Sequence, residues 1–352
     1  MDPITHGIVG AALARSVSVI RPPQNHSESH LWWQLGVLAA LIPDLDYLLF
    51  WVDPLAFLAY WHRSFTHSLF LAPLWSLTIA AAAYLLTAHR YPFVLLWLVA
   101  TAGVLSHCFL DALTPFGTQW FQPFSDVRVS ANLLLVVDGY FTLILLVCLW
   151  LIVKHRSCKS VLLVWFLPVA YLLVVVGIKQ QIRQELSQQL PSNTTPSDIR
   201  LFPQPFSPLL WQAITHKAQG NWRARVFYRT NFIPLPLDAT QRLSGFTTTY
   251  QPSHSPDWQW KPLWPNTGKD NALAKAAWHQ PNFAPFRDFA QYPVLYHLGP
   301  LPPHSPAGSS TCFWFSDLRY HWPGIPPAFR FGLCQQHNGQ WQTHRLPYLS
   351  IP

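Results

Sequence analysis

The sequence predicts a mainly α-helical membrane protein: a bundle of about five transmembrane helices plus a short N-terminal apolar helix, followed by a C-terminal strand-rich extracytoplasmic domain. Three observations predict this fold class. Half of the 352 residues are apolar, and only 11% are charged, against about 25% in ordinary soluble domains. All long apolar runs lie before residue 180, whereas 23 of the 33 prolines follow it. This composition excludes a disordered chain and an ordinary soluble globule, and it divides the protein into domains at residues 1–180 and 181–352.

Five apolar runs are long enough to cross a bilayer as helices. Each has about 18–23 residues, and roughly 30 Å of hydrocarbon requires about 20. They cover residues 33–52, 68–88, 91–113, 133–153 and 161–178. The second and fifth runs contain no charged residue, which argues against core helices of a soluble protein, because such helices carry a polar face. A shorter stretch, Ile4 to Ile20, carries Arg15 and is expected to span the bilayer, to lie in its interface or to re-enter it.

The cations near the ends of the runs predict which side of the membrane each loop occupies. Lys154 and Lys159 flank the connection between the fourth and fifth runs, and Arg90 lies between the second and third. Because Lys and Arg in short loops favour the cytoplasmic side, these loops are predicted to be cytoplasmic. The segments near residues 53–67 and 114–132, and everything after residue 179, are therefore expected to face outward.

The C-terminal domain is expected to consist of short strands between proline-rich turns. Strand-forming segments cover residues 222–231, 310–320 and 329–334. Asn338-Gly339 predicts a hairpin turn after the last of them. Cys312 and Cys334 are either a disulfide of an oxidising compartment or two buried thiols. The net charge of +8 is spread over both domains without a basic cluster, so no nucleic acid partner is expected, and membrane lipids are the expected partner.

Ionisable side chains within the apolar runs are the candidate functional residues. His107 and Asp111 are four positions apart and therefore share one face of an apolar helix, where an unpaired carboxylate costs about 2.5–3.5 kcal/mol. Asp44 and Asp46 follow Pro43, which interrupts the first run. Asp44 either caps the resumed helix or serves the site, whereas capping does not explain Asp46.

Further imidazoles and one further carboxylate lie close to these residues in the predicted topology. His62 and His67 are five positions apart, so on a regular helix they would diverge by roughly 140°. We therefore expect a loop that turns both rings toward one cavity. His6 adds an imidazole to the N-terminal apolar stretch, and Asp138, inside the fourth run, is expected to orient a ligand histidine or to pair with Arg128.

The residue types of this set indicate a metal site. Imidazole nitrogens and carboxylate oxygens without thiolates suit Zn²⁺, with Mn²⁺ or iron as alternatives. The candidate ligands, enough for one or two ions, are His6, Asp44, Asp46, His62, His67, His107 and Asp111. Two other interpretations stay open: the histidines are interfacial anchors and the aspartates helix caps, or the whole set is a proton or ion pathway.

Four motifs, in this order along the chain, resemble the YdjM-type family of inner-membrane metal-dependent hydrolases. They are MDPITHGIVGAAL, IPDLDYL, HRSFTHS and SHCFLDALTPFGTQWFQPFS, and they lie within residues 1–150. FSDLRY, at residues 315–320, resembles a strand in the extracytoplasmic tail of longer members. The resemblance implies a helical domain in the bacterial inner membrane and a hydrolase site that contains the seven candidate ligands.

The helix with His107 and Asp111 is also distantly similar to a metal-binding helix of zinc-dependent phospholipases C and P1-type nucleases, which act on phosphodiesters. No second H-x-x-x-E/D helix follows in the membrane part, so one or two ions are expected rather than three.

Together these features predict a membrane-bound hydrolase that uses metal-activated water at the outer membrane face on an ester or phosphoester of a lipid or lipid-linked substrate. Asp44 or Asp46 is the expected general base, and Arg63 is expected to neutralise charge that develops on the substrate oxygen. Two other functions stay open: an ion- or proton-conducting transporter subunit, and a non-catalytic membrane scaffold with a periplasmic binding domain.

Overall fold

Contacts along the chain divide it into two compact units, and each is described by itself. The computed structural model describes residues 1–155, 157–188, 198–205, 207–217, 221–228, 250–252, 258–265, 268–300, 311–336 and 338–346. The helical unit comprises Met1–Phe57, Trp61–Ile178 and Pro205–Pro208. The strand unit comprises Leu58–Tyr60, Lys179–Gln204 and Leu209–Pro352.

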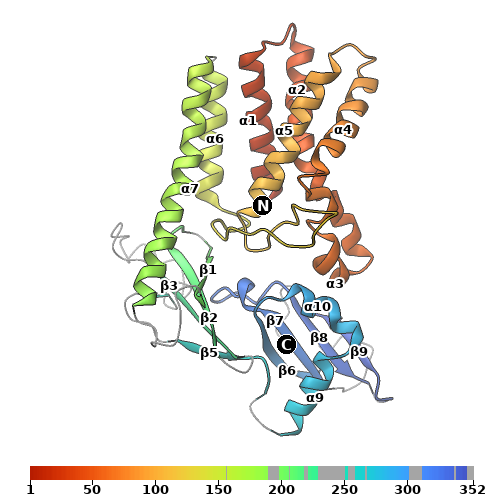
Figure 1. Ribbon diagram of the computed structural model, residues 1–352, viewed down its shortest axis with the longest axis vertical. Coiled ribbons are helices and arrows are strands. Elements are labelled where there is room, and N and C mark those ends of the chain that lie inside the picture. The colour runs from red at the N-terminus through yellow and green to blue at the C-terminus, as the bar shows by residue number, and fades with distance from the viewer. Residues whose placement is uncertain are drawn as a thin grey trace. The chain divides into compact units, whose positions relative to one another are not determined.

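Long α-helices that run alongside one another form the helical unit (Figure 1). They are α1 (Pro3–Ile20), α2 (His26–Leu41), α4 (Ala72–Leu86), α5 (Phe93–Ala112), α6 (Gly139–Lys154) and α7 (Cys158–Ser187). Shorter elements join α2 to α4: the 3₁₀ helix η1 (Ile42–Trp51), α3 (Pro54–Ala56), the π-helix η2 (Phe57–Trp61) and the 3₁₀ turn η3 (Phe65–His67).

Several of these helices are long and apolar enough to cross a membrane. Among the described residues there are four: Pro3–Ile20, His26–Trp51, Phe93–Ala112 and Cys158–Ser187. The number rises to five if Pro54–His67 and Ala72–Leu86, which are bent by 68°, are counted as one span, and α6 is a shorter apolar helix. The predicted helical, membrane-like N-terminal part is confirmed.

Two helices begin at other residues than the apolar runs predicted, those of the first and the fourth run. The first span begins at His26 rather than at residue 33, because Asn25 accepts the backbone N–H of Glu28, and Glu28 in turn accepts the N–H of Gln24. This reciprocal capping starts a helix among polar residues. The expectation that Asp138 lies inside a helix is wrong, since its carboxylate accepts the N–H of Phe141 and thereby begins α6.

The N-terminal helix α1 is a full helix of 18 residues that packs against α2, α5 and α6. Glycines make its crossing with α2 very close. A Cβ atom added at Gly10 would lie 2.3 Å from the carbonyl oxygen of Gly36, and one added at Gly36 would lie 2.5 Å from that of Gly10. A Cβ atom added at Gly103 of α5 would lie 2.8 Å from the Cβ atom of Ala39 in α2. The three helices that carry or lead to the predicted ligands therefore meet at their backbones.

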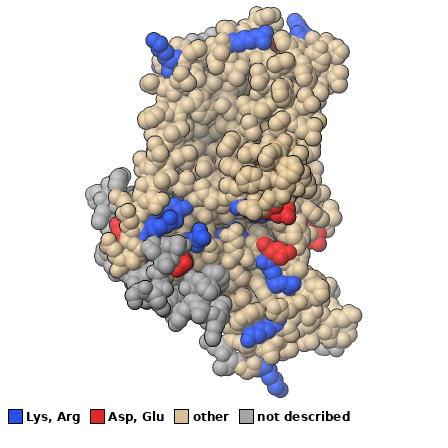
Figure 2. Space-filling model, viewed as in Figure 1, with Lys and Arg blue, Asp and Glu red and all other residues tan. Residues whose placement is uncertain are grey.

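Three connections that carry cations, those from α1 to α2, from α4 to α5 and from α6 to α7, lie at one end of this bundle (Figure 1), and Figure 2 shows Lys and Arg at that end and again lower in the molecule. Arg21 follows the end of α1, whereas His6 lies near its start. Arg90 lies in the connection from α4 to α5, and Lys154 ends α6. Asp111 lies in the last turn of α5. The connections that carry Arg21, Arg90 and Lys154 thus lie at the helix ends opposite the predicted ligands, whereas Arg63 and Arg128 lie beside the ligands.

The described part of the strand unit contains two sheets. The first has the order β1-β2-β3-β4, with β5 also paired to β3, and the second has the order β6-β7-β8-β9. Their strands are β1 (Arg200–Pro203), β2 (Leu210–Lys217), β3 (Asn221–Tyr228), β4 (Gln251–Pro252), β5 (Gln259–Pro262), β6 (Pro293–Pro300), β7 (Thr311–Asp317), β8 (Arg330–Gln335) and β9 (Trp341–Arg345). The helices α9 (Lys269–Trp278) and α10 (Ala284–Phe289) precede β6.

The predicted strand segments agree with these strands. The first becomes β3 as far as Tyr228, and its last three positions lie outside the described residues. The second becomes β7 and the turn Leu318–Tyr320, and its first position, 310, is also outside the described residues. The third becomes β8, and the antiparallel pair β8–β9 joins through a turn where Gly339 has a φ of 79°.

Two covalent or ionic links stabilise the second sheet. Cys312 of β7 and Cys334 of β8 are direct cross-strand partners and form a disulfide, which decides between the two states that the sequence allowed. In the FSDLRY segment, Asp317 accepts the backbone N–H of Arg319 at 2.9 Å and pairs with its buried guanidinium at 2.8 Å. Arg319 also donates to the Phe289 carbonyl at 3.0 Å, so the motif ties β7 to α10.

Candidate metal centre

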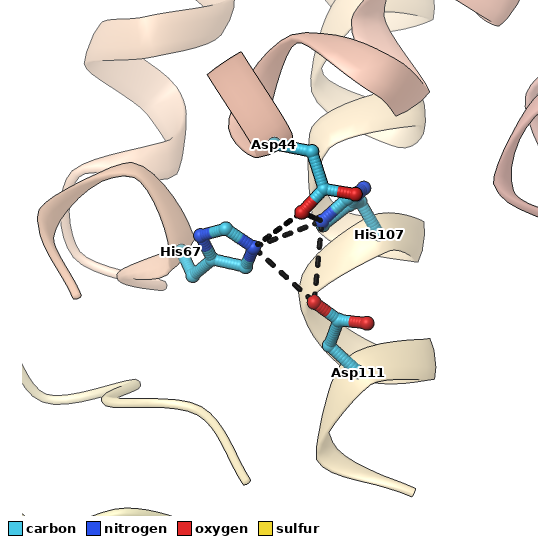
Figure 3. Close-up of side chains that lie close together, drawn as sticks. All are labelled: Asp44, His67, His107 and Asp111. Carbon is cyan, nitrogen blue, oxygen red and sulfur yellow. Dashed lines mark hydrogen bonds and ion pairs between the residues drawn. The ribbon is translucent and has the colours of Figure 1, made fainter. Parts of the chain in front are cut away.

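Four ionisable side chains from three elements point toward one another within the helical unit (Figure 3). Asp44 comes from η1, His67 from η3, and His107 and Asp111 from successive turns of α5. The Nε2 atoms of the two histidines are 2.9 Å apart. Oδ1 of Asp44 is 3.5 Å from each of them, and Oδ2 of Asp111 is 3.2 Å from that of His67 and 3.3 Å from that of His107.

These separations match the coordination shell of a small divalent ion. In a tetrahedral zinc site with bonds of about 2.0–2.2 Å, neighbouring ligand atoms are about 3.3–3.5 Å apart. The four ligand atoms, one from each residue, lie within 4.8 Å of one another, and the measured pairs are 2.9 to 3.5 Å apart. Four of these five pairs, at 3.2 to 3.5 Å, are close to the tetrahedral value, and the two Nε2 atoms, at 2.9 Å, would have to separate slightly to hold an ion.

The outer nitrogens of both histidines have partners, which leaves Nε2 for the centre. Nδ1 of His107 donates to the Ala40 carbonyl at 2.7 Å, so the neutral ring has its lone pair at Nε2. Nδ1 of His67 lies 2.8 Å from the Thr66 hydroxyl. Two imidazole lone pairs and two carboxylate oxygens that face the same point attract a cation.

A second group adjoins the first and shares Asp44 with it. Asp44, Asp46 and His62 offer ligand atoms within 4.8 Å of one another. Nδ1 of His62 is 3.2 Å and 3.3 Å from the two oxygens of Asp46. Asp44 belongs to both groups, so it is the residue that two ions would share.

His6 joins the centre through Asp111. Its Nε2 atom is 3.2 Å from Oδ1 of Asp111, and its ring stacks on His107 with centroids 3.8 Å apart. The amino group of Met1 also forms an ion pair with Asp111. The structure therefore brings all seven predicted ligands into one connected set: His6, Asp44, Asp46, His62, His67, His107 and Asp111.

Arg63 supplies positive charge next to this set. Its Nε atom lies 2.9 Å from Oδ2 of Asp111, and its Nη1 atom donates to the Thr114 hydroxyl at 2.8 Å. Its backbone N–H donates to Asp46 at 2.9 Å, and its carbonyl accepts the N–H of Gln119 at 2.9 Å. Arg63 has a φ of 56°, a left-handed conformation that costs a non-glycine residue about 1–3 kcal/mol, and these contacts hold it there.

Burial makes the charges of the centre interdependent. The side chains of His6, His67, His107 and Asp111 have no exposed surface, and that of Asp46 is 3% exposed. A buried carboxylate without compensation is costly, so its partners are part of the structure rather than incidental. Asp44 has the most exposed side chain of the first group, at 18%, so it is the member most accessible from outside the protein.

Several contributors to the centre were not predicted. The Ala40 carbonyl has no side-chain signal at all, while Thr66 and Thr114 are common residue types whose role depends on the fold. Arg128 was considered only as a partner of Asp138, but its guanidinium donates to the His62 carbonyl at 3.1 Å. The one sequence signal for the role of Arg128 was its position as a basic residue in the polar loop that follows the apolar helix α5.

The contacts of Asp138 are structural and differ from the role predicted for it. Its carboxylate accepts the Phe141 N–H at 2.9 Å and the Tyr171 hydroxyl at 3.2 Å. It therefore caps α6 and ties it to α7, and the expectation that it orients a ligand histidine receives no support from these contacts.

Comparison with known proteins identifies the family. A model of the YdjM inner membrane protein family matches residues 1–182, which is more than half of the chain. The chain belongs to the YdjM inner membrane protein family. The resemblance inferred from the four motifs is thereby confirmed, and with the apolar helices it supports a multi-pass protein of the inner membrane.

Two relatives of this YdjM family member are similar over part of their length. The uncharacterized protein YfhP of Bacillus subtilis is 26% identical over 197 residues, which are 54% of this chain and 58% of YfhP. The inner membrane protein YbcI of Escherichia coli is 35% identical over 101 residues, which are 27% of this chain and 56% of YbcI. The chain thus spans somewhat more than half the length of each relative. No solved structure matches it significantly.

Proposed function

We propose that this YdjM family member is a membrane-bound metal-dependent hydrolase. The observation that carries the proposal is the convergence of Asp44, His67, His107 and Asp111, whose four ligand atoms lie within 4.8 Å of one another in a membrane-like helical unit. Nitrogen and oxygen donors without thiolate favour zinc, with manganese or iron as alternatives. The group with Asp46 and His62 provides for a second ion.

The residues of the chain have separate roles in this proposal. A divalent ion held by these residues would supply Lewis-acid chemistry and would lower the pKa of a water molecule to about 7. With a single ion in the first group, Asp46 is not a ligand and would accept the proton, with Nδ1 of His62 3.2 Å away. Arg63 stabilises the negative charge that develops on the substrate oxygen.

The proposed substrate is an ester or phosphoester of a lipid or a lipid-linked molecule, bound at the outer face of the membrane. The connections that carry Arg21, Arg90 and Lys154 lie at the helix ends opposite the centre, and cations in short loops favour the cytoplasmic side. The disulfide of the strand unit is consistent with an extracytoplasmic position of that unit, because such bonds persist in oxidising compartments.

Elemental analysis of the detergent-purified protein tests the proposal, together with hydrolysis of bis-p-nitrophenyl phosphate as a probe. The wild type is expected to contain stoichiometric zinc, manganese or iron and to cleave the probe. His107→Ala is expected to lose both properties while it still inserts into the membrane, because Nε2 of His107 is central to the group. His155→Ala, which changes an exposed histidine next to the far end of α6, is the matched control. An unchanged metal content in His107→Ala contradicts the assignment.

A further inference from the structure

An antiparallel bridge closes part of the connection from α5 to α6. This connection runs across the end of the helical unit that holds the predicted ligands (Figure 1). The backbones of Thr118 and Val129 form the bridge, with N–H···O distances of 3.0 Å and 2.9 Å. Because residues of antiparallel segments face each other in pairs, the bridge places Gln119 beside Arg128. We call residues 116–129 the loop clamp.

The loop clamp binds the carbonyl groups of two consecutive residues beside the metal centre. The His62 carbonyl accepts N–H groups from both Nη atoms of Arg128, each at 3.1 Å. The Arg63 carbonyl accepts the backbone N–H of Gln119 at 2.9 Å. Since Arg63 has a φ of 56°, which is uncommon for a residue other than glycine, this stretch of backbone needs partners to keep its shape.

The side chain of His62 is held by the same loop clamp. Its ring packs against Phe57, with centroids 4.8 Å apart, and against Phe116 of the clamp, with centroids 4.9 Å apart. The guanidinium of Arg128 lies over the Phe116 ring, 4.9 Å from its centroid, at the distance of a cation–π contact. Arg128 therefore supports His62 in two ways, through its carbonyl and through the aromatic ring that its imidazole contacts.

The position of His62 decides the geometry of the second group. Its Nδ1 atom is 3.2 Å and 3.3 Å from the two oxygens of Asp46, close to the separation of two ligand atoms on one ion. Asp46 in turn accepts the backbone N–H of Arg63 at 2.9 Å. The histidines of the first group have other supports, the Ala40 carbonyl and the Thr66 hydroxyl, which lie outside the loop clamp. A change at Arg128 is therefore expected to affect the two groups differently.

We propose that Arg128 is a positioning residue for a second ion, which the group of Asp44, Asp46 and His62 binds. The inference rests on the proposed function, and it adds the residue that decides whether this ion is held. The two hydrogen bonds of Arg128 are charge-assisted, and its planar guanidinium fixes the direction of the His62 carbonyl. Residues that orient metal ligands in this way typically contribute about 10–100-fold to metal affinity.

Calorimetric titration of Zn²⁺ into the metal-stripped, detergent-purified full chain tests the inference. The wild type is expected to show two binding events, one for each group. Arg128→Gln is expected to keep the first event and to weaken the second about 10–100-fold, because glutamine cannot replace both N–H contacts with the His62 carbonyl. His62→Gln removes the ligand itself and gives the reference curve for a lost second event. Arg90→Gln, the same substitution at the opposite helix ends, is the matched control and leaves both events unchanged.

The first binding event shows whether the Arg128→Gln variant is still folded. An equal loss of both events overturns the inference, because Arg128 would then support the fold as a whole rather than the second group. Wild-type affinity for both ions in this variant overturns it as well. A single binding event in the wild type overturns the inference but leaves a hydrolase with one ion, whereas a wild type that binds no zinc, manganese or iron removes the proposed function itself.

Discussion

Arg63 is the residue that connects the separate parts of the centre. Its guanidinium contacts Asp111 and Thr114, its backbone N–H donates to Asp46, and its carbonyl accepts from Gln119. Through these contacts it links α5, η1 and the loop after α5. The left-handed backbone at Arg63 is an unfavourable local conformation that only this set of partners maintains.

Arg63→Lys is expected to lower hydrolysis of bis-p-nitrophenyl phosphate by about 10²–10³-fold while metal content stays at the wild-type level. Lysine keeps the positive charge but lacks the planar fork that reaches Asp111 and Thr114 together. Steady-state kinetics and elemental analysis on the same preparation check both parts. Arg90→Lys, in a connection at the opposite helix ends, is the control, and loss of metal in Arg63→Lys would contradict the separation of roles.

His321 of the strand unit gives a prediction for pH. Burial of its ring lowers the pKa from 6.5 to about 4, and its Nε2 atom lies 2.7 Å from the Ser316 hydroxyl. The folded state therefore binds fewer protons than the unfolded state between these values. Stability contributed by neutral His321 is present above pH 6.5 and is lost as the pH falls toward about 4.

Hydrogen exchange of β7, corrected for the intrinsic rate, is expected to become faster across that pH interval. The expected change is up to about tenfold per pH unit. In His321→Gln the pH dependence of the corrected rate is expected to be shallower, and the remainder is assigned to groups such as His344 of β9, whose pKa burial also lowers. An equally steep pH dependence in this variant would assign the effect to another group.

At the scale of elements, the close crossing of α1, α2 and α5 sets the positions of the ligands. Gly10, Gly36 and Gly103 allow backbone contact at distances that a Cβ atom would prevent. His6, on α1, and His107, on α5, stack because these helices are so near to each other. A small outward shift of one helix would separate the donors by more than coordination permits.

Gly36→Ala is expected to destabilise the helical unit by about 1–3 kcal/mol through overpacking, and to lower metal content. The new Cβ atom would lie 2.5 Å from the Gly10 carbonyl and 2.7 Å from the Ala14 Cβ, so the helices have to move apart. Thermal unfolding in detergent and elemental analysis measure the two effects.

Gly177→Ala in α7 is the matched control for this substitution. A Cβ atom at Gly177 has no neighbour within 4 Å among the residues that the structure describes, so alanine is expected to be neutral or to stabilise its helix by up to about 1 kcal/mol. If both variants unfold at the same temperature as the wild type, the crossing is not as tight as the backbone distances indicate.

The sequence predicts which segments of the helical unit are helices, but it is less successful in predicting the residues at which these helices begin. Apolar runs locate helices because a helix that crosses the hydrocarbon core of a bilayer needs a long apolar stretch. The start of α2 at His26 depends on the capping by Asn25 and Glu28, and the start of α6 depends on Asp138, so polar residues rather than apolar ones decide both boundaries.

The candidate ligands could be predicted because charge in an apolar helix is rarely incidental. All seven come together, including His62 and His67, whose spacing predicted a loop. What the sequence does not specify is the backbone: the Ala40 carbonyl that fixes His107 and the 3₁₀ geometry of η1 have no residue-type signature. Both depend on packing between segments that are distant in the chain.

At the scale of the whole molecule, the proposed orientation gives a prediction for thiol labelling in spheroplasts. Cys158, exposed at the start of α7, is expected to react with a membrane-impermeant maleimide only after lysis. Asn338→Cys, in the β8–β9 turn and in a Cys158→Ser background, is expected to react in intact spheroplasts. Cys108 and Cys148 are buried, and Cys312 and Cys334 are bonded, so they contribute little background. The reverse pattern would contradict the orientation.

Every proposed donor lies within the first 111 residues, on elements that precede α6. The ribosome therefore finishes the whole ligand set while more than half of the polypeptide is still to be made. Capture of a cation does not have to wait for the strands, whose own disulfide joins residues 312 and 334 much later in synthesis. In the proposed enzyme, metal capture and thiol oxidation are therefore expected to be separate steps of maturation.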